Sequence, residues 1–138
     1  MKKKLNCILL VDDDNDCNYF HKKILKEMDC TESIHVVNDG AEALDFIKSC
    51  NKENNQVPEL IFLDINMPRM NGWEFLEAYE KLPPAFRAQT VIVMLTTSLN
   101  PDDKERAAKL PVINGFKEKY LNVETINDVL KKHFADHF

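Results

Sequence analysis

Acidic residues in this sequence stand directly after two apolar runs. Asp12 and Asp13 follow the run at residues 7–11, and Asp64 follows the run at residues 60–63. Carboxylates that converge repel one another, and a hard divalent cation bound by oxygen ligands relieves that repulsion. These residue types predict a Mg²⁺ site, on the condition that the fold brings the two acidic segments together.

A hydroxyl and an ammonium group follow two later apolar runs. Thr96 comes directly after the run at residues 91–95, and Lys119 follows the run at residues 112–116. A phosphoryl group spreads negative charge over its oxygens, and a cation, an ammonium and a hydroxyl can each meet part of that charge. The set therefore favours phosphoryl chemistry. The sequence has neither a GxxxxGK[ST] loop nor a GxGxxG motif, so a nucleotide is not the obvious phosphoryl source.

Strand-length apolar runs alternate with stretches of helical periodicity. A weaker run at residues 34–37 joins the four runs already named, and each is β-branched or aromatic in part. Between the runs, apolar residues recur at the three- and four-residue spacing of a helix face. The helical stretches carry Cys17, Phe20, Ile24, Leu25 and Met28; Ala43, Leu44 and Ile47; Phe75, Leu76 and Tyr79; residues 102–110; and Ile126, Val129, Leu130 and Phe134.

This alternation predicts a doubly wound α/β fold, with a five-stranded parallel sheet and helices on both faces. A proline pair at residues 83–84 ends the third helix, Asn100 and Pro101 open the fourth, and residues 49–56 form a polar loop. Asp14 is interpreted as an acid at a helix start. Because ligands bind outside the carboxyl ends of such strands, we expect the acidic, hydroxyl and ammonium groups to gather at one edge of the sheet.

Length, charge and cysteine spacing narrow the class of protein. The 138 residues make one domain, and the net charge of −5 excludes the broad basic surface of a nucleic-acid or anionic-membrane binder. No apolar run approaches the roughly 20 residues that cross a bilayer. The cysteines Cys7, Cys17, Cys30 and Cys50 stand far apart, without CxxC pairing. The sequence therefore predicts reduced thiols in a cytoplasmic protein.

Four segments together resemble a known family. They are LLVDDD at residues 9–14, LDINMPRMNG at 63–72, LTTS at 95–98 and FKEK at 116–119. In this order they are similar to the signatures of the receiver domain of two-component response regulators. The likeness extends over essentially the whole chain. It implies a single receiver domain over residues 1–138 with a CheY-like, flavodoxin-like (βα)5 fold, of the stand-alone type without an output domain.

The resemblance assigns a phosphoacceptor and a metal site. It implies that Asp64 takes a phosphoryl group from a phosphohistidine on a sensor histidine kinase or a histidine phosphotransfer protein. Asp13, Asp64 and the backbone carbonyl of Asn66 would bind Mg²⁺ directly, and Asp12 would hold a metal-bound water. The protein would then be no enzyme in the usual sense, because it catalyses only its own phosphorylation and dephosphorylation.

The resemblance also implies a switch. Lys119 would pair with one phosphoryl oxygen and Thr96 would hydrogen-bond another, with a coupled movement of Phe116. The face built from the helix at residues 102–110, the strand at 112–116 and the last helix would then change its affinity for a downstream protein. In one respect the chain departs from the family, which usually has proline after the lysine, often with a cis peptide. Tyr120 stands there, and a non-proline cis bond costs about 3 kcal/mol, which favours a trans peptide.

Two other functions compete with the signalling switch. One is a small Mg²⁺-dependent phosphohydrolase that forms an aspartyl phosphate, as haloacid-dehalogenase-type enzymes do. Those enzymes want a second aspartate two residues after the nucleophile, and Asn66 occupies that position. The other is a receiver-like binding module that is never phosphorylated, which would be credible if the acidic pair or Asp64 were replaced.

Overall fold

In the computed structural model, residues 4–52, 57–87, 90–97 and 100–135 are described, and within them five parallel strands form one sheet in the order β2-β1-β3-β4-β5. The strands are β1 (Leu5–Val11), β2 (Thr31–Val37), β3 (Leu60–Asp64), β4 (Val91–Thr96) and β5 (Gly115–Glu118). The helices are α1 (Asn15–Met28), α2 (Gly40–Lys52), α3 (Gly72–Glu80), α4 (Pro101–Ala108) and α5 (Val123–His133), with a short 3₁₀ turn η1 (Pro84–Phe86). This is the predicted doubly wound fold, with the strand order of flavodoxin and CheY.

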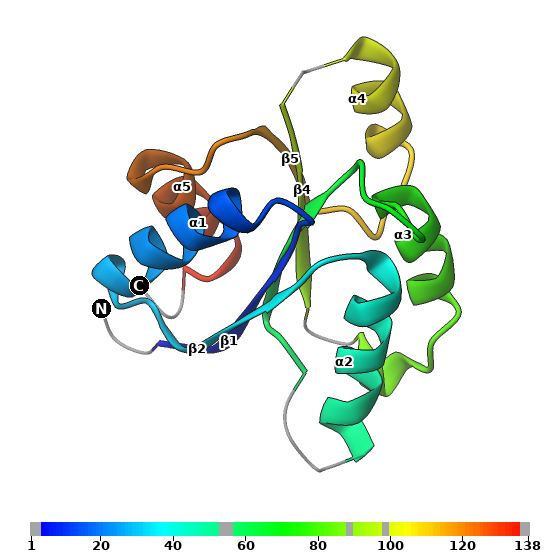
Figure 1. The fold of residues 1–138 in the computed structure, drawn as a ribbon, viewed down its shortest axis with the longest axis horizontal. Helices are drawn as coiled ribbons and strands as arrows, with labels where there is room; N and C mark the ends of the chain where they lie inside the picture. The colour runs from blue at the N-terminus through cyan, green and yellow to red at the C-terminus, as the bar shows by residue number, and fades with distance from the viewer. Residues whose placement is uncertain (1–3, 53–56, 88–89, 98–99, 136–138) are drawn as a thin grey trace.

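Helices cover both faces of the sheet. Helices α1 and α5 lie on one face, and α2, α3 and α4 lie on the other (Figure 1). Alternate side chains of the central strands enter the two cores: Leu60 and Phe62 pack toward α1 and α5, whereas Ile61 and Leu63 pack toward α2 and α3. A strand that is buried on both faces has no polar side to show, which explains the continuous apolar runs in the sequence.

The predicted strands at residues 7–11, 34–37, 60–63 and 91–95 are confirmed, and the fifth is displaced. Strand β5 begins at Gly115, so residues 112–114 of the predicted run precede it. Asn114 accounts for the shift, because its Oδ1 accepts a hydrogen bond from the Ile92 N–H at 2.9 Å and its own N–H donates to the Ile92 carbonyl at 2.8 Å. Val112 and Ile113 instead pack on the core beside α2 and α3.

The predicted helices are confirmed in order, with corrections to their bounds and to one face. Helix α3 ends at Glu80, before the proline pair, which instead begins η1, and α4 ends at Ala108 and not at residue 110. Helix α2 continues to Lys52, so the loop expected at residues 49–56 is wrong in its first half, and residues 53–56 lie outside the described part of the chain. On α1 the predicted apolar stripe is wrong at Phe20, which is 47% exposed, while Asn18 and His21 are buried in its place. The interior of this helix is thus more polar than its periodicity suggests.

Side-chain caps fix where the helices begin. The Asp14 carboxylate accepts hydrogen bonds from the N–H groups of Asp16 and Cys17, which confirms it as the acid at the start of α1. The Asn100 side chain accepts from the Asp102 N–H and Pro101 follows it, as predicted for α4. Each cap therefore fixes the start of a helix that follows a strand, at the carboxyl edge of the sheet.

Helix α4 also contacts α3 through one side-chain pair. The Arg106 Cζ atom lies 4.4 Å from the centre of the Trp73 ring, within the range of a cation–π contact. Trp73 is the second residue of α3, close to the loop that follows β3. The contact therefore joins the first turn of one helix to the last turn of the other.

The cysteines lie in the interior of the fold. Cys7, Cys17, Cys30 and Cys50 all lie in the described part of the chain, and each is buried and free. Burial raises the pKa of Cys7 to about 11 and that of Cys17 to about 12, so these thiols are protonated at neutral pH. Among the described residues, no helix combines the length and apolar character that a membrane span requires.

Candidate functional site

The acidic residues from two neighbouring strands meet at the carboxyl edge of the sheet. Val11 pairs with Leu63, so Asp12, just beyond β1, lies beside Asp64, the last residue of β3. Asp12, Asp13 and Asp64 each place a carboxylate oxygen within 4.8 Å of the others. Asp12 and Asp64 are 4% and 7% exposed, and Asp13 is open to solvent. This all-oxygen donor set, open on one side, fits a hard cation that keeps several waters, as Mg²⁺ does.

Lys119 lies between the two buried carboxylates. Its Nζ atom is 2.6 Å from Asp12 Oδ2 and 3.4 Å from Asp64 Oδ1, and its side chain is 6% exposed. Burial by itself would lower the pKa of Lys119, but the hydrogen bond and the charge of Asp12 outweigh it, and the pKa is raised. The ammonium therefore stays charged and offsets part of the repulsion between the two carboxylates.

The electrostatics of Asp64 set it apart from an ordinary aspartate. Burial, followed by the negative charge of Asp12, raises the pKa of Asp64 to about 6, while Lys119 acts in the opposite direction. The carboxylate is still mostly ionised at neutral pH. A cation bound beside it would favour the charged form further, so a metal ion and the ionised carboxylate would stabilise each other at this position.

The loop after β5 carries Lys119 to the site. The Lys119 N–H donates to the Thr96 carbonyl at 2.6 Å, and the Leu121 N–H donates to His21 Nε2 at 3.0 Å. The peptide between Lys119 and Tyr120 is cis, so the expectation of a trans bond is wrong. The hydrogen bonds on either side of this peptide fix the course of the loop, and the lysine reaches the acidic cluster without the proline of the family pattern.

Thr96 lies on β4 beside Asp64, and Phe116 lies on the neighbouring strand β5. Thr96 is buried at the end of β4, one residue beyond Leu95, which pairs with Asp64. Phe116 is half-buried in β5, opposite Met94, and packs on the core beside α2 and α3. Their roles in a switch stay predictions. Ser98, the last residue of the LTTS segment, lies outside the described residues.

Two asparagines hold the end of β1 in place. Neither was predicted from the sequence to do so. Asn18 Nδ2 donates to the Asp12 carbonyl at 2.8 Å, and Asn38 Nδ2 donates to the same oxygen at 3.0 Å. The Asp12 carboxylate also accepts a hydrogen bond from the Asp14 N–H at 3.0 Å. Asn18 belongs to α1, and Asn38 follows β2. Asn38 is a polar residue just after a strand end, which is the signal that could have found it, whereas Asn18 lies within the helix and has no such signal.

The loop after β3 carries Asn66, the residue whose carbonyl was predicted to bind metal. Asn66 is exposed two residues after Asp64, and the loop closes where the Gly72 N–H donates to the Ile65 carbonyl at 2.8 Å. A Cβ atom at Gly72 would stand 2.6 Å from the Asp64 carbonyl oxygen. Glycine is therefore required at this position, because any side chain would push the start of α3 away from the strand that bears Asp64.

Charges attach this loop to the start of α2. Arg69 forms an ion pair with Asp39 and a second one with Glu42 at 3.0 Å. We refer to Asp39, Arg69 and Glu42 as the arginine clasp. Burial alone would raise the pKa of Asp39, but the Glu42 N–H and the Arg69 guanidinium together hold it below its ordinary value. A backbone hydrogen bond from Gly40 to the Met70 carbonyl, at 3.0 Å, lies beside the clasp.

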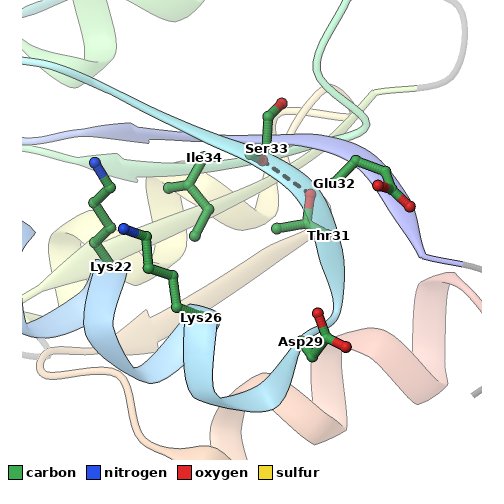
Figure 2. A pocket seen from close by; sticks show the side chains of 7 residues that line it. All are labelled: Lys22, Lys26, Asp29, Thr31, Glu32, Ser33 and Ile34. Carbon is green, nitrogen blue, oxygen red and sulfur yellow. Dashed lines mark hydrogen bonds between the residues drawn. The ribbon is translucent and has the colours of Figure 1, made fainter.

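A separate shallow pocket lies at the other end of the sheet. Lys22 and Lys26 of α1 face residues 31–34 of β2 across it, with Asp29 at the turn between the two elements (Figure 2). Thr31 pairs with Leu5 at the beginning of β1, so this pocket of about 330 Å³ is at the opposite end of the strands from Asp12. Two lysines and two acidic residues line it, and it takes no part in the acidic cluster.

Comparison with known proteins identifies the family. Residues 8–134 match the model of the response regulator receiver domain. The chain belongs to this family. The receiver domain is 32% identical over 120 residues to the response regulator Rcp1 of Synechocystis sp., over 86% of this chain and 80% of that protein.

Solved structures agree with this assignment. The receiver domain superposes on a two-component response regulator from Cytophaga hutchinsonii with a TM-score of 0.88 and 26% identity, over 96% of this chain and 99% of the other. It also matches the phosphorylated cyanobacterial phytochrome response regulator RcpA, with a TM-score of 0.77 and 25% identity over 96% of each chain. The family resemblance and the fold drawn from the sequence are thereby confirmed, and the chain is a two-component signalling domain.

Proposed function

We propose that this receiver domain accepts a phosphoryl group on Asp64 from a phosphohistidine of a sensor histidine kinase or a histidine phosphotransfer protein. The observation that carries the proposal is the meeting of Asp12, Asp13 and Asp64 around one point, with the Lys119 ammonium beside them. The similar protein RcpA is described as phosphorylated, which supports the same chemistry here. The function would be signalling, not turnover of a metabolite.

The Asp64 carboxylate would act as the nucleophile. One of its oxygens forms a bond to phosphorus while the bond from phosphorus to the histidine nitrogen breaks, and the imidazole leaves with that electron pair. Asp13, Asp64 and the carbonyl of Asn66 would hold Mg²⁺, with Asp12 acting through a water molecule. When bound, Mg²⁺ would neutralise charge on the phosphoryl oxygens. Asp64 is poised for this role because it is nearly buried yet ionised at neutral pH.

Lys119 and Thr96 would respond to the new phosphoryl group. The added charge gives Lys119 a stronger partner than the two carboxylates it now contacts, and the Thr96 hydroxyl can hydrogen-bond another phosphoryl oxygen. Phe116, on the strand beside Thr96, would move with them. The face formed by α4, β5 and α5 would then bind its downstream protein differently, as a shift between two populations of conformers.

Incubation with acetyl phosphate and Mg²⁺ tests the proposal directly. We expect intact-mass measurement to show one added phosphoryl group on the parent protein and none on Asp64→Asn. Asp45→Asn is the matched control, because Asp45 is exposed on α2, away from the acidic cluster. EDTA should block the labelling, and undiminished labelling without metal would contradict the roles given to Asp13 and Asp64.

Two other outcomes would favour the competing functions. An unchanged mass of the folded parent protein would support a binding module that is never phosphorylated. Continuous release of phosphate from simple monoesters would support a phosphohydrolase, against which Asn66 in place of a second aspartate already argues. If labelling succeeds, transfer from a panel of phosphorylated histidine kinases would identify the partner by its rate.

A further inference from the structure

We propose that His21 is a positioning residue for Lys119: its buried imidazole holds the loop after β5 so that the lysine ammonium reaches Asp12 and Asp64. The inference rests on the proposed phosphoacceptor function, because it concerns the group expected to pair with the phosphoryl oxygen. His21 itself touches neither the acidic carboxylates nor any reacting atom. Its effect would be transmitted through the backbone of the loop.

The contact joins two parts of the chain that are distant in sequence. His21 is 1% exposed on the inner face of α1, and its Nε2 atom accepts the hydrogen bond of the Leu121 N–H at 3.0 Å, across 100 residues. An imidazole nitrogen that accepts must carry a lone pair, so the ring proton resides on Nδ1. Cys17 Sγ lies beside the ring, 3.6 Å from both Nδ1 and Nε2.

His21 completes a two-point attachment of the loop. Before the exposed Tyr120, the Lys119 N–H is bonded to the Thr96 carbonyl at 2.6 Å. After Tyr120, Leu121 is buried and its N–H is bonded to His21. The Tyr120 ring also meets the imidazole edge-on, with the ring centres 6.1 Å apart. Removal of the acceptor would leave the Leu121 N–H buried without a partner, and the loop would have to move to reach water.

Helix α1 thereby contacts both the end of β1, which carries Asp12, and the loop that carries Lys119. Asn18, one turn before His21 on the same face, donates to the Asp12 carbonyl at 2.8 Å. One rigid element thus sets the end of β1 through Asn18 and the lysine loop through His21. The separation between Asp12 and Lys119 then depends on α1, which packs beside α5 on that face of the sheet (Figure 1).

The imidazole is suited to a permanent acceptor. Burial, as the largest cause, lowers the pKa of His21 to about 4, so the ring is neutral and its Nε2 lone pair available at neutral pH. A protonated ring would have two N–H groups and could not accept the Leu121 hydrogen bond. The geometry and the protonation state therefore support the same role.

Two substitutions separate the hydrogen bond from mere packing. His21→Gln places an amide oxygen near the position of Nε2, whereas His21→Leu fills the space without an acceptor. At saturating Mg²⁺ and acetyl phosphate, we expect His21→Leu to be phosphorylated about ten- to a hundredfold more slowly than the parent, because Lys119 is misplaced. Its affinity for Mg²⁺ should stay within about twofold, and His21→Gln should recover most of the rate. Leu25→Val is the matched control: it weakens the core of the same helix but leaves the acceptor of the Leu121 N–H in place, and it should label at the parent rate.

A nuclear magnetic resonance measurement tests the contact independently of activity. In ¹⁵N-labelled parent protein, the Leu121 amide nitrogen and His21 Nε2 should share a scalar coupling across the hydrogen bond. Absence of that coupling would overturn the proposal, as would a folded His21→Leu at the parent rate or an equal loss in His21→Gln and His21→Leu. If His21→Leu does not fold, His21→Gln and the coupling still decide. A parent protein that is never phosphorylated would refute the proposed function instead, and the coupling would still report whether the attachment exists.

Discussion

The two loops that flank the acidic cluster are attached by different physical means. The loop after β3, which carries Asn66, is held by the arginine clasp, and the Arg69 side chain is 68% exposed. The loop after β5, which carries Lys119, is held by hydrogen bonds to Thr96 and to the buried His21. Exposed ion pairs are screened by salt, whereas a buried neutral hydrogen bond is not. The affinity of the predicted metal site for Mg²⁺ should therefore depend on ionic strength, whereas the placement of Lys119 should not.

Removal of the Lys119 ammonium group should have the largest of the expected effects, a slower phosphorylation of the protein. Lys119→Met leaves Asp12 and Asp64 without the cation they now contact and takes away the partner of the incoming phosphoryl oxygen. We expect the rate of phosphorylation by acetyl phosphate to fall about 10²- to 10³-fold, the range seen when one stabilising charge or donor is removed. Intact-mass time courses measure it. Lys109→Met, on an exposed lysine paired with Glu105, is the control that should keep the parent rate.

Acid should weaken the attachment of the lysine loop through His21. The native pKa of about 4 lies below the usual 6.5, so the unfolded chain binds the proton more tightly. Stability from this residue is complete above pH 6.5 and is lost as pH falls toward 4, by roughly 3 kcal/mol in total. In urea unfolding between pH 4 and 7, the acid limb of the parent should fall increasingly below that of His21→Gln as the pH decreases, because the other titrating groups contribute to both proteins. Identical limbs in the two proteins would refute the assignment.

Asp64 should change the stability of the protein in the opposite direction over nearly the same pH range. Its native pKa of about 6 lies above the ordinary 3.8, so the folded metal-free protein binds the proton more tightly. Stability from this residue is present below pH 4 and is lost as pH rises through 6. Asp64→Asn, which cannot ionise, should therefore be roughly 3 kcal/mol more stable than the parent at pH 7.5 without metal. The gain should vanish near pH 4, and a gain independent of pH would contradict this account.

The arginine clasp should give the smallest and most salt-dependent effect. Arg69→Gln removes both ion pairs but keeps the Gly40 to Met70 backbone hydrogen bond that lies beside them. We expect the affinity for Mg²⁺ to fall about fivefold or less at low salt, and the difference to shrink near 1 M salt. Titration calorimetry at two ionic strengths measures both. A difference that is equally large in high salt would show that the clasp acts through packing and not through charge.

The sequence was sufficient to predict strands β1 and β3 and the acidic cluster at their ends. Strands β1 and β3 are buried on both faces, so each appears as an unbroken apolar run, and the rule that sites lie at carboxyl ends then places Asp12 beside Asp64. Lys119 was identified by the family pattern, because a lysine in a lysine-rich stretch has no distinctive local signal. The strand order then brings Asp12, Asp64 and Lys119 to the same edge of the sheet.

The supporting contacts could not be predicted, because their partners are far apart in the chain. Nothing near His21 indicates that its acceptor faces Leu121, and the apolar periodicity of α1 selected Phe20, its exposed neighbour, as a core residue. The start of β5 was misplaced for a similar reason. The Asn114 side chain bonds to the backbone of Ile92, a contact that depends on the neighbouring strand and not on local propensity.

The contact between Trp73 and Arg106 gives the protein an intrinsic fluorescence probe. Trp73 is the sole tryptophan of the sequence, so the protein's indole emission arises at one place, where a guanidinium from α4 lies over the ring of a residue in α3. A displacement of α4 changes the field and the quenching at that ring. Fluorescence spectra recorded during phosphorylation would then follow the motion of this helix in real time, without a dye or an added label.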